Sequence, residues 1–137
     1  MDKCDAAAIL KQNELKVTQQ RLLLLESIID SERVFSTISL HEKVKNSMDL
    51  VTIYRILSIF LDKKIIREIV SNETTRFYEL SCEHNPIHPH FTCNKCKRII
   101  CLNQIENTDI SNLKKYSGDN LTDDVIIQLT GTCSNCR

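Results

Sequence analysis

The sequence has no long apolar run, no net charge and no low-complexity tract. No apolar segment approaches the roughly 18 residues that a membrane-spanning helix needs, so we expect no membrane partner. Its first residues, Met1–Cys4, lack the apolar stretch of a signal peptide, which favours a cytoplasmic protein. The formal net charge of zero excludes only a protein that is basic throughout.

The length excludes a large multidomain enzyme, and the composition excludes a disordered polymer. The 137 residues, 42% of them hydrophobic and 26% charged, suit one ordinary domain or two small ones. A small domain of about 60 residues buries only about 60% of its unfolded surface, so it needs additional stabilisation. Both prolines, Pro86 and Pro89, lie close together. We therefore place the hinge there, between a domain of residues 1–81 and one of residues 82–137.

Apolar side chains recur at helical spacing in the first half of the chain. Residues 18–29 form the first such segment, and Thr18 is a plausible N-cap for it. Three of its apolar residues share one helical face: Leu22, Leu25 and Ile29. A second, shorter helix is indicated by a repeat every four positions: Leu40, Val44 and Met48.

The clearest helix begins after Asp49, a second possible N-cap. Its apolar residues follow the spacing i, i+3, i+4, i+7 and i+8, which buries one stripe: Ile53, Ile56, Leu57, Phe60 and Leu61. Two β-rich runs, 65–70 and 75–80, then flank a polar turn at 71–74. Three helices followed by a hairpin predict an α+β fold that begins with a winged helix-turn-helix domain.

The outer face of the third helix suits DNA. A helix-turn-helix places its second helix in the major groove, and Thr52, Tyr54 and Arg55 would begin that helix. Arginine binds a guanine edge or a phosphate, and tyrosine contacts a thymine methyl or a phosphate. Residues 43–67 carry four more basic than acidic side chains. The alternative is that these cations merely solvate the outer face of a helix packed on the core.

The cysteines are concentrated in the second half of the chain. Six of the seven, with three of the four histidines, lie from Cys82 to Cys136. In a reducing cytosol this usage indicates metal or redox chemistry instead of disulfides. Two Cys-x-x-Cys pairs have the spacing of a tetrahedral structural zinc site: Cys93, Cys96, Cys133 and Cys136. A dithiol oxidoreductase would need a βαβ context, which the pattern does not show.

A second group of ligand types surrounds the prolines: Cys82, Glu83, His84, His88, His90 and Cys101. Pro89 disfavours a helix, and side chains two residues apart on a strand share a face, so His88 and His90 lie side by side. If the Cys-x-x-Cys turn closes a hairpin in which residue 93 faces residue 98, His90 faces Cys101. A slip of one residue would turn Cys101 to the opposite face. Cys82 or His84 would supply the remaining ligand, and the mixed nitrogen and sulfur set suits zinc better than iron or manganese.

The chain resembles the ferric uptake regulator family over nearly its whole length. Four motifs carry the resemblance: KVTQQR at 16–21, VTIYR at 51–55, HPHFTCNKC at 88–96 and GTCSNC at 131–136. It implies a dimeric bacterial repressor that binds double-stranded operator DNA, with a winged-helix domain and a small α/β dimerisation domain. It also implies that Lys16 contacts the minor groove, that Tyr54 and Arg55 contact DNA, and that His88 and His90 bind the sensed metal.

Departures from the family pattern favour zinc as the regulatory ion. Val34 and Val125 stand where iron-sensing members carry histidines, Ile87 and Pro89 replace ligands of a further metal site, and Cys101 replaces a carboxylate. Cys82 resembles the thiolate of the zinc uptake regulators. We therefore expect a zinc-sensing repressor of metal uptake genes. The alternatives are an iron- or peroxide-responsive member, a thiol or metal-dependent enzyme, and a zinc store. Whether Glu79, Glu83 or His84 also ligates metal stays open.

Overall fold

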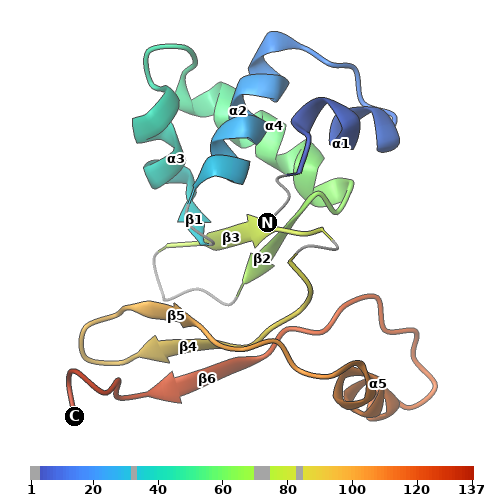
Figure 1. Cartoon of the computed structure of the whole chain (residues 1–137), viewed down its shortest axis with the longest axis vertical. Helices are drawn as coiled ribbons and strands as arrows, with labels where there is room; N and C mark the ends of the chain where they lie inside the picture. Colours follow the sequence, from blue (N-terminus) through green and yellow to red (C-terminus); the bar gives the residue numbers. More distant parts are fainter. Residues whose placement is uncertain (1–3, 32–33, 70–74, 83–84) are drawn as a thin grey trace. The chain divides into compact units, whose positions relative to one another are not determined.

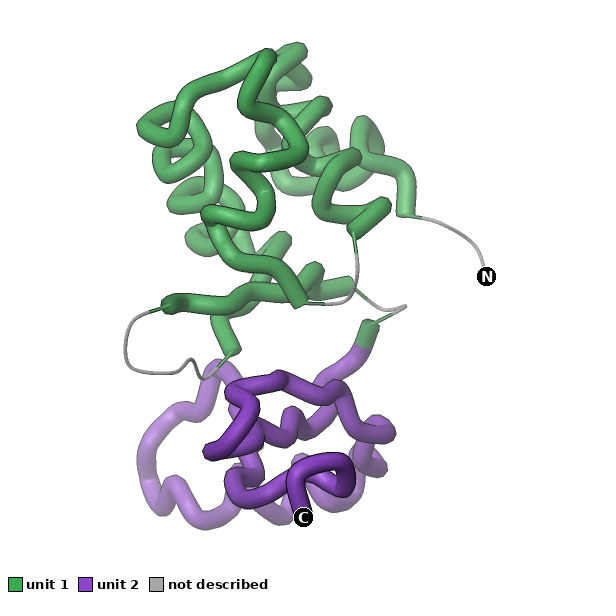
Figure 2. The backbone as a smooth tube through the Cα atoms, turned by 90° about the vertical axis from the view of Figure 1, so that its left-hand side faces the viewer, with its two compact units in different colours: residues 1–85 green, residues 86–137 purple. Residues whose placement is uncertain are grey.

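The computed structural model describes residues 4–31, 34–69, 75–82 and 85–137. The chain forms two compact units, Met1–Asn85 (unit 1) and Pro86–Arg137 (unit 2), drawn in different colours in Figure 2. The division falls after residue 85, whereas the sequence analysis places it after residue 81. Among the described residues, no helix has both the length and the apolar character that a membrane crossing requires.

Four helices are described in unit 1: α1 (Ala6–Gln12), α2 (Gln19–Asp30), α3 (Thr37–Val44) and α4 (Leu50–Asp62). The N-caps explain where the helices begin, because the side chains of Asp5, Thr18, Ser36 and Asp49 accept hydrogen bonds from the first turns. The predicted caps Thr18 and Asp49 are confirmed. Helix α1 was not predicted, because its seven residues are too few for a clear periodic pattern.

The stripe that α2 buries differs from the predicted one. Leu24, Leu25 and Ile28 are buried, while Leu22 and Ile29 pack against the edge of the core. The sequence runs through four consecutive leucines at positions 22–25, so spacing alone does not fix which side of the helix faces inward. Tertiary packing against α1 and α3 makes that choice.

The strands of unit 1 form a three-stranded antiparallel sheet. They are β1 (Phe35–Ser36), β2 (Ile66–Ile69) and β3 (Phe77–Leu80), in the order β1-β3-β2. The β2–β3 pairing is the predicted hairpin, and the predicted polar turn at 71–74 lies outside the described residues. Strand β1 just before α3 was not predicted. Helices α3 and α4 followed by this hairpin form the winged helix-turn-helix (Figure 1).

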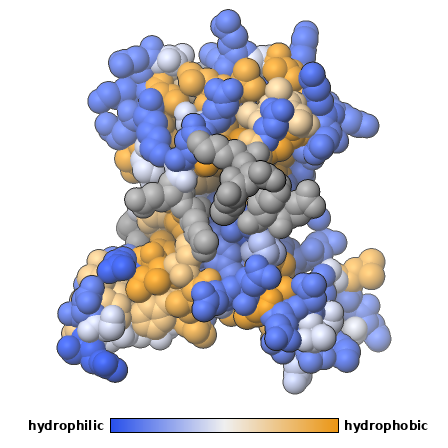
Figure 3. Space-filling view, viewed as in Figure 1, coloured by the Kyte–Doolittle hydropathy of each residue, from blue (hydrophilic) through white to orange (hydrophobic). Residues whose placement is uncertain are grey.

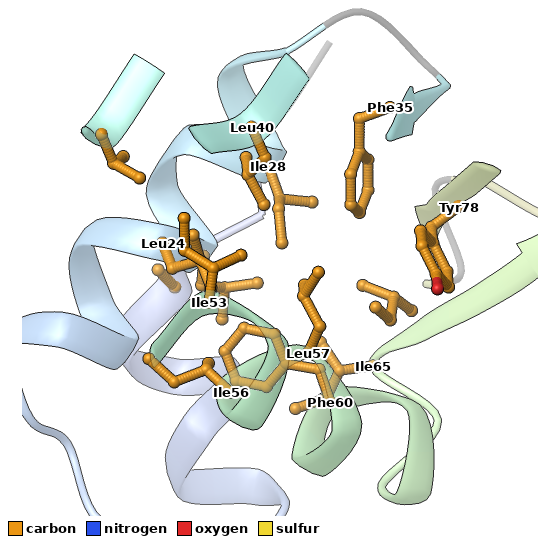
Figure 4. Packing of buried hydrophobic residues seen from close by; sticks show 14 of the residues in the cluster. Leu24, Ile28, Phe35, Leu40, Ile53, Ile56, Leu57, Phe60, Ile65 and Tyr78 are labelled. Atoms are coloured by element: carbon orange, nitrogen blue, oxygen red, sulfur yellow. The ribbon is translucent and has the colours of Figure 1, made fainter. Parts of the chain in front are cut away.

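Apolar side chains from all four helices and the sheet form one core in unit 1. Figure 4 shows Ile53, Leu57 and Phe60 of α4 pointing toward Leu24 of α2 and Phe35 of β1. This packing buries the predicted stripe of α4 and leaves Arg55 and Lys63 exposed. The core therefore fixes which face of α4 is turned to solvent.

A buried ion pair closes the end of unit 1. Arg67 on β2 and Glu79 on β3 are cross-strand partners, and Arg67 Nε donates to Glu79 Oε1 at 2.6 Å. Arg67 Nη2 also donates to the carbonyl of Asn85 at 2.8 Å, and the Asn85 amide donates to the carbonyl of Leu80. These bonds hold the last residues of unit 1 against the hairpin.

Unit 2 contains a second three-stranded sheet and one described helix. The elements are β4 (His90–Cys93), β5 (Ile99–Cys101), α5 (Asn107–Lys115) and β6 (Gln128–Gly131). The order is β5-β4-β6, with β5 antiparallel and β6 parallel to β4. A parallel neighbour needs a crossover, and α5 lies within that crossover. Of the described residues in this unit, few are buried: His88, Pro89, His90, Thr92, Cys93 and Cys133.

The core of unit 1 generates a stability prediction. Ile53→Ala removes a side chain that is 0% exposed, so we expect the free energy of unfolding to fall by about 2–5 kcal/mol. Val51→Ala is the matched control on the same helix, because Val51 is 62% exposed and its truncation should change stability by less than about 0.5 kcal/mol. Urea unfolding followed by circular dichroism measures both. Equal losses would contradict the assigned inner face of α4.

Candidate functional sites

Helix α4 presents a phenol and a guanidinium to solvent. Asp49 caps the helix by accepting a hydrogen bond from the Thr52 amide at 2.9 Å. Hydrogen bonding with the Thr52 side chain, and then with this amide, lowers the pKa of Asp49 below its ordinary value. Ile53 points into the core, so its neighbour Tyr54 is 53% exposed. Arg55 is also exposed, whereas Thr52 is half-buried. The predicted DNA-contacting side chains of this helix therefore lie on or at the edge of its outer surface.

A concavity of about 360 Å³ lies beside these residues, between α4 and the hairpin. Tyr54 of α4 and Tyr78 of β3 line it together with Arg76. Burial raises the pKa of Tyr78 above its ordinary value, so this phenol stays neutral. The sequence analysis missed Arg76, because it counted the basic excess only up to residue 67. The available signal was a cation directly after the polar turn of a predicted hairpin.

Lys16 lies in the segment between α1 and α2. Its side chain is exposed, and its carbonyl oxygen accepts a hydrogen bond from Arg21 Nη1 at 3.0 Å. This bond links the segment to the first turn of α2. The lysine is thus presented to solvent on unit 1, the unit that also carries α4.

Four cysteine sulfurs converge in unit 2. Cys93 ends β4, Cys96 follows in the turn to β5, and Cys133 and Cys136 follow β6. The β4–β6 pairing places Cys93 beside Gly131 and so brings the two Cys-x-x-Cys turns together. All four sulfurs lie within 4.8 Å of one another, and the Cys96–Cys133 pair is 3.8 Å apart. Sulfurs bound tetrahedrally to zinc at about 2.3 Å lie about 3.8 Å apart, so the donor set fits that ion.

Backbone amides prepare one of these sulfurs for a cation. Cys93 Sγ accepts hydrogen bonds from the amides of Cys133, Cys96 and Lys95, each at 3.4 Å. With the Cys133 bond as the largest cause, they lower the pKa of Cys93 to about 6. Hydrogen bonding with Cys133 raises the pKa of Cys136 to about 12. Cys93 thus gives up its proton readily, whereas Cys136 retains a proton that a metal cation would displace.

Three further ligands meet on the other face of the same sheet. The structure pairs His90 with Cys101, which confirms the register predicted from the Cys-x-x-Cys turn. His88 and His90 are each 5% exposed, and their ring centroids are 4.5 Å apart. The ligand atoms of His88, His90 and Cys101 lie within 4.8 Å of one another. Two imidazoles and one thiol therefore form a compact set that one metal ion can bind.

The backbone orients one of the two imidazoles. His88 Nδ1 lies 3.0 Å from the carbonyl oxygen of Pro86, which can only accept, so Nδ1 donates. In the neutral ring Nε2 then carries the lone pair that a metal requires. A carbonyl that fixes the tautomer of a ligating histidine is typical of metal sites. The sequence analysis did not predict this contact.

The other predicted metal ligands lie in unit 1 or outside the described residues. Cys82 follows β3, and its Sγ is 3.3 Å from Cys4 Sγ. Glu79 lies on β3, where Arg67 binds its carboxylate. Glu83 and His84, which the sequence analysis left open, fall outside the described residues. The structure therefore brings His88, His90 and Cys101 together and places Cys82 beside Cys4.

Comparison with known proteins decides the family. The sequence profile of the ferric uptake regulator family matches residues 12–124, which include α4 and the His88–Cys101 segment. The chain belongs to the ferric uptake regulator family. Members of this family are metal-responsive transcriptional regulators, not enzymes, and they bind operator DNA as dimers. The chain is accordingly a regulator, which excludes the alternative of a thiol or metal-dependent enzyme.

Individual relatives agree with this assignment. The ferric uptake regulation protein of Campylobacter jejuni subsp. jejuni is 30% identical over 138 residues, which cover 94% of this chain and 84% of the relative. The crystal structure of the Vibrio cholerae ferric uptake regulator has a TM-score of 0.70 at 26% identity and covers 94% of this chain and 100% of that one. The manganese-containing regulator of Pseudomonas aeruginosa has a TM-score of 0.77 at 18% identity, covers 96% and 99%, and supports the fold alone. The predicted α+β fold is confirmed.

The sulfur cluster generates a prediction about metal content. Cys96→Ser removes one of four converging sulfurs, so we expect the loss of about one tightly held zinc per chain and a fall in Tm on the order of 10 °C. Cys4→Ser is the matched control, because it makes the same substitution in unit 1. Elemental analysis and differential scanning calorimetry measure the two effects. Normal zinc content in Cys96→Ser would remove Cys96 from the site.

Proposed function

We propose that this family member is a zinc-responsive repressor that controls metal uptake genes. The observation that carries the proposal is the donor set of His88, His90 and Cys101, whose ligand atoms lie within 4.8 Å of one another. A thiolate beside two imidazoles is a soft to intermediate set, which suits zinc. Iron(II) and manganese sites favour carboxylate and imidazole ligands, and Cys101 contributes neither. Cys82 remains a predicted ligand of the same ion.

We assign the second zinc to a structural role. The four cysteine sulfurs would close a tetrahedral shell and leave no open coordination position. Unit 2 has few buried apolar side chains, so crosslinking β4, the following turn and the chain after β6 would supply stability that packing does not. Zinc at this site would be held whether or not the regulatory site is filled.

The surface of α4 is the proposed operator interface. Tyr54 and Arg55 are exposed on a helix whose inner face is fixed by the core, so they project outward in one defined direction. Arg55 can bind a guanine edge bidentately, and Tyr54 can contact a phosphate or a thymine methyl. Lys16 and Arg76 add cations on the same unit, Lys16 as a minor-groove contact.

Unit 2 carries the proposed dimer contact. Figure 3 shows hydrophobic side chains gathered over the β5-β4-β6 sheet. Phe91, Ile100 and Leu129 are register neighbours and therefore share the face opposite to His90. Leu129 is 50% exposed. A second copy of the chain would cover such a face, while the opposite face holds the regulatory ligands.

Metal binding would act on DNA affinity through differential binding. His88 and His90 follow Asn85, the last residue of unit 1, by three and five positions, and Cys101 lies on the strand that pairs with β4. A metal bound by all three favours the conformation in which residues 88–101 are ordered as observed. If the operator also binds that conformation better, the metal and the operator raise each other's affinity for the protein. By thermodynamic linkage, the two affinities rise by the same factor.

The regulatory ligands generate the first functional prediction. Replacing both His88 and His90 with alanine should reduce zinc-dependent operator affinity at least tenfold, because two of three ligands are lost, while the tightly held zinc remains. Fluorescence anisotropy on a labelled operator, with zinc, iron(II) or manganese added separately, measures the response. His41→Ala on α3 is the control. A wild-type response to iron but none to zinc would favour the iron-sensing alternative, and sensitivity to peroxide with bound iron would favour the peroxide-sensing one.

The outer face of α4 generates the second functional prediction. Arg55→Ala should lower operator affinity by roughly 1–3 kcal/mol if Arg55 binds a base edge bidentately, and metal content should not change. Arg98→Ala removes the same charge from an exposed position of unit 2 and serves as the matched control. Both variants are compared at one salt concentration, because phosphate contacts are salt-dependent. Equal affinities for Arg55→Ala and wild type would exclude Arg55 from the interface.

A further inference from the structure

Two of the seven cysteines lie in unit 1, far apart in sequence and adjacent in space. Cys4 Sγ donates a hydrogen bond to Cys82 Sγ across 3.3 Å, although 78 positions separate them. A disulfide has an S–S distance of about 2.05 Å, so the two sulfurs need to approach by only about 1.3 Å. Neither sulfur belongs to the four-cysteine cluster or to the group of His88, His90 and Cys101.

The backbone holds both cysteines in place. Cys4 directly precedes Asp5, the N-cap of α1, and α1 is anchored in the core by Ala6 and Leu10. Cys82 forms a β-bridge with Asn85, and the Asn85 amide donates to the Cys82 carbonyl at 2.9 Å. Two anchored backbone segments therefore hold the two sulfurs close to each other.

Solvent reaches this pair. Both side chains are partly exposed, and they line a pocket of about 440 Å³ on unit 1 together with Asp5, Lys64 and Ser81. A small polar oxidant such as hydrogen peroxide fits this space easily. In the four-cysteine cluster, Cys93 and Cys133 are buried, Cys136 is partly exposed and Cys96 is exposed. Exposure therefore does not distinguish the two groups of cysteines. Zinc bound to the cluster would engage the lone pairs of its four sulfurs, whereas Cys4 and Cys82 lie outside that cluster and beside each other.

We propose that Cys4 and Cys82 form a peroxide-oxidisable dithiol, a modification site outside the four-cysteine cluster. One sulfur, as thiolate, attacks a peroxide oxygen; the S–O bond forms, the O–O bond breaks, and hydroxide leaves and is protonated to water. The second sulfur attacks the resulting sulfenic acid; the S–S bond forms, the S–O bond breaks, and the departing hydroxide takes the thiol proton. Two thiols are oxidised and one peroxide is reduced to two waters.

The disulfide would connect the start of α1 to the segment that leaves the hairpin of unit 1. It closes a loop that spans nearly all of this unit, and crosslinks across long loops restrict the unfolded chain most. We therefore expect oxidation to stabilise the unit that carries α4. It would also withdraw Cys82 from metal binding, because one sulfur cannot serve both purposes.

The test uses the full chain carrying its tightly held zinc, treated with stoichiometric hydrogen peroxide. Intact mass should fall by two hydrogens, peptide mapping should identify a Cys4–Cys82 link, and zinc content should not change. Calorimetry should show a rise in Tm on the order of 10 °C that dithiothreitol reverses. This result does not depend on which metal the regulator senses.

Three single variants make the outcome decisive. Cys4→Ser and Cys82→Ser should each abolish both the mass change and the rise in Tm, whereas Cys101→Ser, which removes the remaining cysteine outside the zinc cluster, should retain them. The proposal is overturned if the link joins other cysteines, or if peroxide releases zinc while Cys4 and Cys82 stay reduced. Retention of the Tm rise in Cys4→Ser would overturn it equally.

Discussion

The convergence of four cysteine sulfurs is the constraint on which the second half of the molecule depends. Cys93 and Cys133 are among its few buried side chains, and the parallel pairing of β4 with β6 is what brings their two turns together. A cation at this point would tie three chain segments to one centre. The same pairing fixes β4, which carries His90 on one face and Phe91 on the other. The positions of the proposed regulatory ligands and of the apolar face therefore both depend on how this small sheet is closed.

The N-terminal unit reaches its stability by a different route. Apolar residues of four helices and a sheet pack around Phe60 and Ile53. This core fixes which face of α4 is turned to solvent. An interface for DNA needs such rigidity, because side chains that must reach base edges lose affinity if their helix can rotate. Arg67 and Glu79 extend the rigid region to Asn85, the last residue of unit 1.

The seven cysteines divide by environment into three groups. The sulfurs of Cys93, Cys96, Cys133 and Cys136 lie close to one another, and backbone amides donate to Cys93, which suits a closed metal site. Cys101 lies opposite His90, where a thiol changes the preference of a histidine pair toward softer ions. Cys4 and Cys82 lie beside each other and line a pocket, which suits oxidation. Cysteine chemistry in this chain is thus determined by position more than by local sequence.

The sequence by itself determined the winged-helix plan, the caps at Thr18 and Asp49, the two Cys-x-x-Cys turns and the His90–Cys101 register. Each follows from spacing within one segment or from the geometry of one tight turn. Only the tertiary structure decided which face of α2 is buried, that β6 runs parallel to β4, that Pro86 orients His88 and that Cys82 meets Cys4. These features depend on packing or on contacts between segments that are distant along the chain. The periodicity of a short stretch of sequence cannot predict such contacts.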